Sequence, residues 1–358
     1  MAHSIESIRL RPGMYVGDLH DGSGRLQLLW ELVANAFDQC LAGACDEIGV
    51  MIDAEGAFVV EDNGRGMRVD LVDGVPFAQL ALTRHHDAPT LDGHAPHEHL
   101  GTRGVGLFPV CALAQRLDLD VFRDGRHYAQ CFERGLPCGP LRDVGASDRR
   151  GTRIRVLPDP SIFGATPIET DAIAAKLHAM SCLFPTLRFR FADRRERLFH
   201  APEGLQTLVD DMLRRDGARA IGEAFSCNAR IDDLRVEVAA VWCDRGDRRI
   251  ESYANVSRTT GGGTHENGLL RGLAQGARSL GTLPVAGLRV REVERAIGQG
   301  LRAVVCVRLT DPTYARPTRE RLISPGVSDL VARCVAPCFA QWLAGERAIS
   351  AHLAARFG

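Results

Sequence analysis

Lysine is almost missing from this chain of 358 residues. Of its 44 basic residues only Lys176 is a lysine, and all others are arginines. The basic residues are balanced by 45 acidic ones, which leaves a formal net charge of −1. This balance excludes an overall field that attracts nucleic acid or an anionic membrane, so any such contact would need a local patch.

Three other features are absent: cysteine pairs at metal-binding spacing, an N-terminal signal peptide, and an apolar run of transmembrane length. The 11 cysteines are scattered along the sequence. We therefore expect buried or free thiols in a reducing cytoplasm, and no membrane contact. With 45% hydrophobic residues, the chain has material for two domains with sizeable cores.

Apolar periodicity predicts helices and strands in irregular alternation. We expect helices over residues 28–43, 170–184 and 269–277, and one C-terminal helix over roughly residues 327–353. A hairpin is expected over residues 47–66, followed by further strands, and the pattern restarts around His200 to Glu203. Such an order is typical of α+β layers rather than of a parallel nucleotide-binding sheet.

The first of these helices has an unusual polar face. In "LLWELVANAFDQCLAG" the apolar residues recur at helical spacing, and Glu31, Asn35 and Asp38 share another face. A solvated surface is the simplest explanation for such a face. The alternative is that the carboxylates and the amide face a ligand.

Two glycine-rich stretches favour the ligand. In "EDNGRGM" a carboxylate, Asp62, is followed by glycines that let the backbone approach a ligand closely. In "GTRGVG", which begins at Gly101, glycines open a helix where free N–H groups favour a phosphate. Each stretch alone is a weak signal, but their order and spacing together point to a bound nucleotide.

With these motifs the chain resembles the ATPase region of the type IIA topoisomerase B subunits, those of bacterial gyrase and topoisomerase IV. "RPGMYVGD", "ELVANAFDQ", "EDNGRGM", "GTRGVG" and "RGTRIRV" carry the resemblance in the first half. "SYANVSRTTGGGTHENGLLRGL" and "DPTYARPTRERLISPGV" carry it through the second half. The latter two favour the topoisomerase branch over other ATPases with the same nucleotide fold.

The resemblance implies a Bergerat-type (GHKL) two-layer α/β sandwich followed by a ribosomal-protein-S5-like transducer domain. The expected boundaries are 1–200 for the ATP-binding domain, 201–345 for the transducer and 346–358 for the end of a C-terminal helix. We expect the metal-binding TOPRIM domain and the DNA-cleavage domain to be missing. The segment before Arg11 is shorter than the N-terminal arm that reaches across the dimer in gyrase-like proteins.

The resemblance further implies roles for individual residues. Glu31 would be the general base that activates water, and Asn35 would hold Mg²⁺. Asp62 would accept a hydrogen bond from adenine. The other expected ATP-binding residues are Arg65, Gly66, Met67, Gly101, Thr102, Arg103, Gly104, Val105, Gly106 and Thr152.

Two segments depart from the family pattern. Where the family has a Gln-Thr-Lys triplet that contacts the γ-phosphate, this chain has Pro317, Thr318 and Arg319. Arg319 keeps the charge and is expected to replace the lysine, although the two side chains are not interchangeable. The predicted ATP lid is rich in histidine, which suggests polar lid residues or, as an alternative, a zinc site; these are His85, His86, His94, His97 and His99.

The expected function is that of a stand-alone, cytoplasmic, Mg²⁺-dependent ATPase in which ATP drives dimerisation or a conformational switch that acts on a separate partner. The first alternative is an enzyme that activates or phosphorylates a small molecule. The second is a decoy that binds ATP-site inhibitors, since Asp62, Arg65 and Arg123 match positions that contact them in the family. DNA contact stays open, because acidic residues are interleaved with the arginine clusters.

Overall fold

The computed structural model describes residues 4–41, 43–84, 106–164, 166–281, 283–316 and 318–357. The chain divides into two compact units, Met1–His200 (unit 1) and Ala201–Gly358 (unit 2). Among the described residues, no helix has the length and apolar character needed to cross a membrane.

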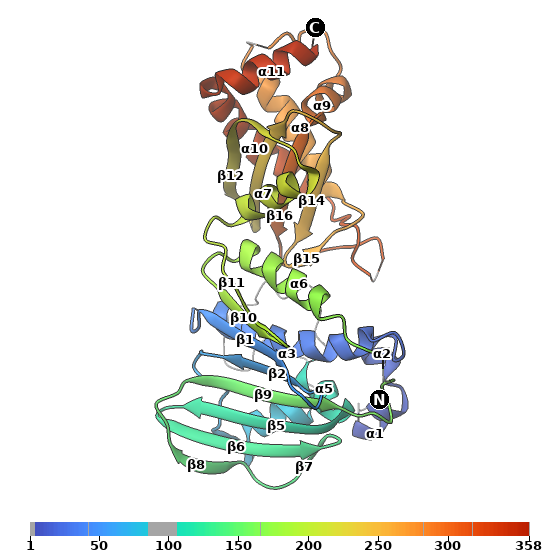
Figure 1. The fold of residues 1–358 in the computed structure, drawn as a ribbon, viewed down its shortest axis with the longest axis vertical. Coiled ribbons are helices and arrows are strands. Elements are labelled where there is room, and N and C mark those ends of the chain that lie inside the picture. Colours follow the sequence, from blue (N-terminus) through green and yellow to red (C-terminus); the bar gives the residue numbers. More distant parts are fainter. Residues whose placement is uncertain are drawn as a thin grey trace. The chain divides into compact units, whose positions relative to one another are not determined.

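Unit 1 combines six helices with eleven strands in its described part (Figure 1). The helices are α1 (Ile5–Leu10), α2 (Gly13–Val16), α3 (Ser23–Leu41), α4 (Phe77–Thr83), α5 (Leu107–Leu113) and α6 (Thr170–Leu183). The strands are β1 (Glu47–Ile52), β2 (Phe58–Asp62), β3 (Leu71–Val72), β4 (Val75–Pro76), β5 (Ala114–Arg123), β6 (Arg126–Glu133), β7 (Leu136–Pro137), β8 (Arg142–Ala146), β9 (Gly151–Pro158), β10 (Arg188–Ala192) and β11 (Glu196–Phe199).

Nine of these strands form one sheet in the order β11-β10-β1-β2-β9-β5-β6-β7, with β8 paired to β6. All pairs are antiparallel except β1 with β10. Helices α3, α5 and α6 pack against the strands from one side. The mixed helix-and-sheet layers confirm the predicted α+β class.

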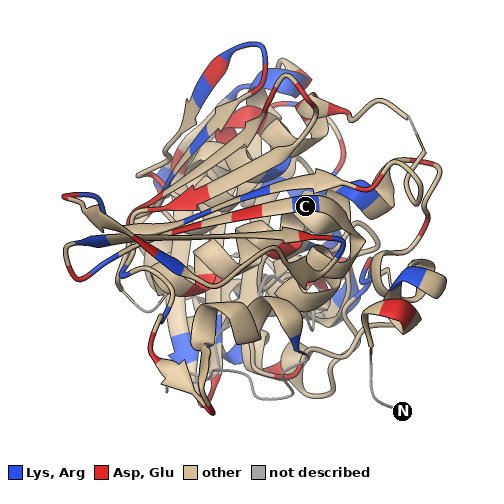
Figure 2. Ribbon diagram, turned by 90° about the horizontal axis from the view of Figure 1, so that it is seen from below, with Lys and Arg blue, Asp and Glu red and all other residues tan. Residues whose placement is uncertain are grey.

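Charged side chains of both signs occupy the strands of the sheet. Arg155, for example, is paired with Asp53 at 2.8 Å and with Glu55 at 2.6 Å. Figure 2 shows basic and acidic residues interspersed along the ribbon rather than gathered by sign. This mixture agrees with the interleaving of acidic and basic residues in the sequence.

The predicted helix over residues 28–43 is α3, which begins at Ser23 and ends at Leu41. Its apolar stripe is fully buried, and Leu28, Leu29, Val33 and Phe37 have no exposed surface. The helix packs against β1 and β2, so the polar residues on its other side face away from this part of the core.

Unit 2 begins with α7 (Leu205–Asp216) and is built around a sheet of five strands in the order β12-β13-β16-β14-β15. The strands are β12 (Ala220–Ile231), β13 (Leu234–Cys243), β14 (Arg249–Ala254), β15 (Ser257–Arg258) and β16 (Leu301–Arg308). The remaining helices are α8 (Thr264–Ser279), α9 (Val290–Gly298), α10 (Val327–Gly345) and α11 (Arg347–Phe357).

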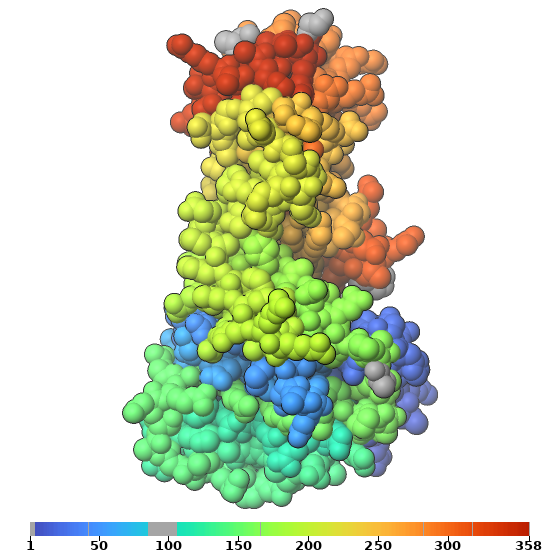
Figure 3. All heavy atoms as spheres, viewed as in Figure 1, coloured from blue at the N-terminus to red at the C-terminus, as the bar shows by residue number. Residues whose placement is uncertain are grey.

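Strand β16 is buried on both faces of this sheet. Its alternate residues Ala303, Val305 and Val307 belong to the core that also contains apolar residues of α8 and α10. Helix α7 also packs on β13 and β16. Helix α11 lies at the surface of unit 2, where it is drawn in red in Figure 3.

The expectation of one C-terminal helix over residues 327–353 is wrong. Helix α10 ends at Gly345, and Glu346 leaves the helical conformation with φ −95° and ψ 83° before α11 begins. Glycine is a poor helix former, and the Ser350 hydroxyl bonds to the carbonyl of Leu343 across the break. Helix α10 therefore ends at Gly345 because of local backbone conformation and hydrogen bonding, although the apolar pattern of the sequence continues.

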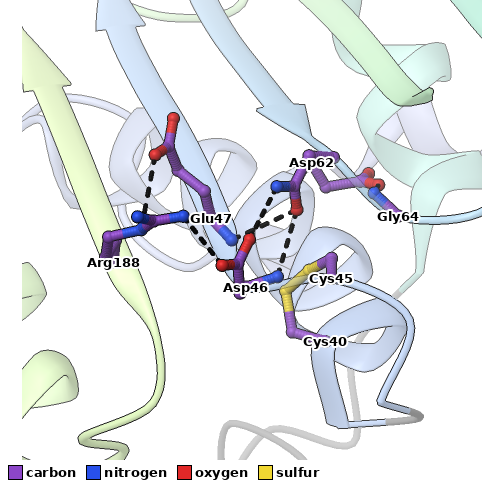
Figure 4. Close-up of a disulfide and its surroundings, with 8 residues drawn as sticks. Cys40, Cys45, Asp46, Glu47, Asp62, Gly64 and Arg188 are labelled. Atoms are coloured by element: carbon purple, nitrogen blue, oxygen red, sulfur yellow. Dashed lines mark hydrogen bonds and ion pairs between the residues drawn. A yellow bond between two sulfur atoms is a disulfide. The ribbon is translucent and has the colours of Figure 1, made fainter. Parts of the chain in front are cut away.

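The expectation of unpaired cysteines is also wrong at one place. Cys40 at the end of α3 and Cys45 before β1 form a disulfide, with their Cα atoms 4.3 Å apart (Figure 4). The turn between α3 and β1 brings the two side chains together, a relation that scattered spacing does not reveal. The other nine cysteines are free thiols.

Helices α8 and α10 pack closely because glycines line the contact. A Cβ atom on Gly272 would lie 2.7 Å from the Cβ atom of Val335, which is shorter than any ordinary contact. Gly268 and Gly276 are similarly close to α10. The helix backbones approach each other only while these positions carry no side chain.

We expect Gly272→Ala to lower the free energy of unfolding by about 1 to 3 kcal/mol, because its methyl group overpacks this contact. Gly139→Ala is the matched control, since nothing lies within 4 Å of a Cβ atom there. Urea unfolding of both variants measures the difference. Equal stability of the two variants would contradict the close packing of α8 on α10.

Candidate functional site

The Glu31 carboxylate is buried in the middle of α3, where an apolar side chain would be the usual choice. It is 4% exposed. The side-chain amide of Gln27, one turn earlier, donates a 2.7 Å hydrogen bond to its Oε1 atom. The backbone N–H of Gly106 donates a 3.2 Å hydrogen bond to Oε2. Both oxygens therefore have donors, as a buried carboxylate requires.

Gly106, the last residue of the predicted phosphate segment, lies at this carboxylate. It directly precedes α5 and has a left-handed φ of 75°, which glycine adopts without strain. Gly106 and Glu31 are 75 residues apart in the sequence, yet a hydrogen bond joins them. The predicted Gly101, Thr102, Arg103, Gly104 and Val105 lie outside the described residues, and so do the five lid histidines.

Asn35 follows Glu31 by one turn of α3, so both side chains lie on the same side of the helix. Asn35 is half-buried. Asp38 lies one further turn along and is also half-buried. The structure thus keeps the three polar residues of the predicted face in one row.

Asp62 ends strand β2 and is 2% exposed. Its Oδ1 atom accepts a 2.9 Å hydrogen bond from the backbone N–H of Gly64. Burial raises the pKa of this carboxyl to about 7, although the backbone N–H groups of Gly64 and Thr152 act in the opposite direction. The carboxyl is thus an acceptor shielded from water, close to the disulfide (Figure 4).

The turn after Asp62 requires glycine. Gly66 has φ 76°, and a Cβ atom on it would lie 2.7 Å from the carbonyl oxygen of Phe122. The guanidinium of Arg123 donates a 2.8 Å hydrogen bond to the Gly66 carbonyl. The backbone N–H of Met67 donates a 3.0 Å bond to the buried hydroxyl of Thr152. The structure therefore brings Asp62, Gly66, Met67 and Thr152 together.

Arg65 differs from its neighbours on the same turn, because it is exposed. Arg65 is therefore a sequence neighbour of Gly66, but its side chain lies at the surface. Among the described residues there is no group of three His, Cys, Asp or Glu side chains arranged to hold a metal ion. The predicted zinc alternative falls on the lid histidines, outside the described residues.

Arg319 lies in unit 2, on a loop tied to the glycine-rich segment before α8. Leu322 donates to the Gly262 carbonyl at 3.1 Å, and Gly261 donates to the Glu320 carbonyl at 2.7 Å. Arg319 itself has a positive φ of 60°, an uncommon conformation for a residue with a side chain. Its guanidinium lies 5.7 Å from the centroid of the Tyr314 ring.

Two residues near Glu31 escaped the sequence analysis. Gln27 stands one turn before Glu31, and this spacing could have identified it as a partner. Lys176 of α6 has no such signal, because only the fold brings α6 to α3. Burial lowers the pKa of Lys176 to about 8, and the nearby Glu31 carboxylate opposes this fall.

The raised pKa of Asp62 makes stability depend on pH. A carboxyl whose pKa is raised by folding contributes stability that is fully present below its unfolded pKa and is lost as the pH rises through about 7. We expect Asp62→Asn to flatten the profile of unfolding free energy between about pH 4 and pH 7, measured by urea unfolding. Asp171→Asn is the control, since that side chain is 98% exposed. Parallel profiles for the parent and Asp62→Asn would refute the raised pKa.

Comparison with known protein families finds a matching family for each of the two units. Residues 21–161 match the family described as histidine kinase-, DNA gyrase B-, and HSP90-like ATPase, and residues 204–357 match the family described as DNA gyrase B. The first match contains Glu31, Asn35, Asp62 and Thr152. The predicted ATP-binding fold and transducer fold are therefore confirmed.

Curated relatives agree with these matches. The DNA gyrase B protein of Campylobacter jejuni is 32% identical over 339 residues, which cover 92% of this chain and 43% of that protein. The DNA gyrase B protein of Halalkalibacterium halodurans is 32% identical over 329 residues, 89% of this chain and 51% of that protein. The chain thus spans about half the length of these relatives.

Solved structures match over the whole chain. The ATPase domain of Thermus thermophilus gyrase B, solved with an aminocoumarin, has a TM-score of 0.83 and 30% identity and covers 99% of this chain and 92% of its own. The topoisomerase IV ATP-binding domain of Francisella tularensis has a TM-score of 0.78, 25% identity and coverage of 100% and 96%. The chain therefore belongs to the gyrase B family of type IIA topoisomerases and corresponds to its ATPase and transducer region.

Proposed function

We propose that this chain is an Mg²⁺-dependent, ATP-hydrolysing module in which nucleotide binding drives dimerisation or a conformational switch. The observation that carries the proposal is the Glu31 carboxylate, buried and joined by a hydrogen bond to the backbone of Gly106. The proposed general base is thereby adjacent to Gly106, the last residue of the proposed phosphate-binding segment. Neither the small-molecule enzyme nor the inhibitor decoy has comparable support in the geometry of the described residues.

The described residues fit an adenine nucleotide. Asp62 offers a buried acceptor for the adenine amino group. A hydrogen bond to the nucleobase is strongest where water is excluded, as it is at Asp62. Gly66, Met67 and Thr152 lie beside it, with Gly66 at a position where a side chain would collide with the backbone. Arg65, exposed on the same turn, is proposed to border the bound nucleotide.

At the phosphate end, we assign Glu31 the role of general base. Its carboxylate would orient a water molecule and accept its proton as the water attacks the γ-phosphate. Gly106 is proposed to bind phosphate oxygens through its backbone N–H, which requires release of the hydrogen bond to Glu31. The same role is proposed for the neighbouring glycine segment, namely Gly101, Thr102, Arg103, Gly104 and Val105.

Asn35 fits a magnesium ligand, because its half-buried amide lies one turn from Glu31 on the same side of α3. Magnesium in nucleotide sites is commonly held by one or two protein oxygens together with phosphates and water. When bound there, it would offset the charge that develops on the phosphates. Asn35 itself would supply one oxygen and thereby fix the triphosphate relative to α3.

Arg319 is proposed to contact the γ-phosphate in place of the family lysine. The backbone bonds that tie its loop to Gly261 and Gly262, and its positive φ, support a preset conformation rather than a loose loop. A guanidinium binds phosphate oxygens as a fork, so it can report the presence of the γ-phosphate. This contact would couple unit 2 to the nucleotide.

Assembly and partners belong to the proposal as well. The similarity to gyrase B proteins over most of the chain supports a nucleotide-dependent homodimer that works in the cytoplasm. We propose that the switch acts on a separate protein partner. We assign no DNA-binding feature among the described residues.

The first test is phosphate release from Mg·ATP over a range of protein concentrations. We expect specific activity to rise with concentration, because dimerisation completes the switch, and to fall by about 10² to 10⁴ in Glu31→Ala. Gel filtration with a non-hydrolysable analogue should shift the protein from monomer to dimer. Activity that does not depend on Glu31 would contradict the role of the base, and an analogue without effect on mass would contradict dimerisation.

The second test concerns Arg319. We expect Arg319→Ala to lower turnover by at least about tenfold, because the charge that stabilises the γ-phosphate is lost. Arg316→Ala is the matched control, an exposed arginine on the same loop. Stopped-flow phosphate assays and calorimetric ATP binding measure both. If turnover and affinity are unchanged in Arg319→Ala, the sensor role is excluded.

A further inference from the structure

The only lysine of the chain contacts Trp30, the residue that precedes the carboxylate used by the proposed function. Lys176 belongs to α6, whose residues Ile173, Leu177 and Met180 are buried and hold the helix on the sheet of unit 1. The side chain of Lys176 is half-buried. Every other basic position of the chain, counted over Lys and Arg, carries arginine.

The Lys176 ammonium is fixed against an aromatic ring. Its Nζ atom lies 3.7 Å from the centroid of the Trp30 ring on α3. A cation over the face of tryptophan is attracted by the ring quadrupole, and the attraction grows when the pair is shielded from water. Trp30 directly precedes Glu31 in α3, so this contact places a positive charge against the helix at the position next to Glu31.

The charges of Lys176 and Glu31 act on each other. Burial lowers the pKa of Lys176, and the Glu31 carboxylate raises it. The interaction is reciprocal, since an ammonium that is favoured by a carboxylate favours the ionised carboxylate to the same extent. Gln27 and Gly106 satisfy the two oxygens of Glu31 by hydrogen bonds, but neither of them carries a charge.

We propose that Lys176 is a positioning residue that acts on Glu31 through its charge: its ammonium, held on the Trp30 ring, keeps the Glu31 carboxylate ionised for its role as base. This inference rests on the proposed function, because a base matters only if ATP is hydrolysed.

The first experiment compares Lys176→Met and Lys176→Arg in Mg·ATP hydrolysis. We expect Lys176→Met to lower kcat about tenfold with KM for ATP changed less than about twofold, because the charge acts on the base and not on ground-state binding. Lys176→Arg should recover most of the loss, since it restores the charge. Arg195→Met, an exposed residue of the same unit, is the control for loss of a cation.

Thermal unfolding of the same variants separates positioning from packing. Lys176→Met that keeps the Tm of the parent and the parent kcat would overturn the proposal. So would a Lys176→Arg variant that loses as much kcat as Lys176→Met, because the restored charge would then be without effect. If both variants lose kcat and also show a much lower Tm, Lys176 serves packing, and the proposal is overturned too.

The second experiment does not need ATP hydrolysis. Cyanate carbamylates neutral amines: the lysine nitrogen bonds to the carbon of isocyanic acid, and a proton passes from the amine to the cyanate nitrogen. Because Lys176 is the only lysine, peptide mass spectrometry separates its product from that of the N-terminal amine. The rate at neutral pH reports the fraction of Lys176 in the neutral amine form, and hence the charge beside it.

We expect Glu31→Gln to speed carbamylation of Lys176 at pH 7 about twofold or more, because the carboxylate that favours the ammonium is gone. Glu169→Gln, exposed at the start of the same helix, should leave the rate unchanged. Equal rates in the parent and Glu31→Gln overturn the proposal. If instead the parent shows no Glu31-dependent hydrolysis while this rate responds to Glu31, the charge contact stands and the ATPase assignment alone fails.

Discussion

A carboxylate removed from water sets the constraints on the rest of unit 1. Glu31 is 4% exposed, and a buried carboxylate is tolerated only with donors on its oxygens and a compensating charge nearby. Gln27 provides the first donor from α3 itself, and Gly106 provides the second from the segment before α5. Helix α3 accordingly packs against α5, and Lys176 of α6 lies over the Trp30 ring next to Glu31.

The proposed adenine end of the site depends on close backbone approach rather than on charge. Gly66 and Gly151 sit where a Cβ atom would meet carbonyl oxygens, at 2.7 Å for Gly66 and at 1.7 Å for Gly151. These close approaches bury Asp62 and raise its pKa. The site thus holds one carboxyl with a raised pKa at one end and one carboxylate with bound donors at the other, two environments suited to a hydrogen-bond acceptor and a base.

Much of this arrangement could be predicted from the sequence. The apolar stripe of α3 and the row of Glu31, Asn35 and Asp38 follow from helical spacing, and glycines around Asp62 indicate a tight turn. Contacts between distant segments could not be predicted in this way. The Lys176 contact with Trp30, the Cys40–Cys45 disulfide and the break at Glu346 depend on tertiary packing or on one local turn. A periodic pattern carries no information about either.

The account is tested most directly by single-turnover hydrolysis of labelled ATP, with protein in excess, for the parent and Glu31→Gln. Glu31→Gln keeps the shape of the side chain and removes its basicity. The account predicts that both proteins bind Mg·ATP with similar affinity and that only the parent converts the bound ATP to ADP and phosphate. Conversion by Glu31→Gln at the parent rate would contradict the central role of this carboxylate.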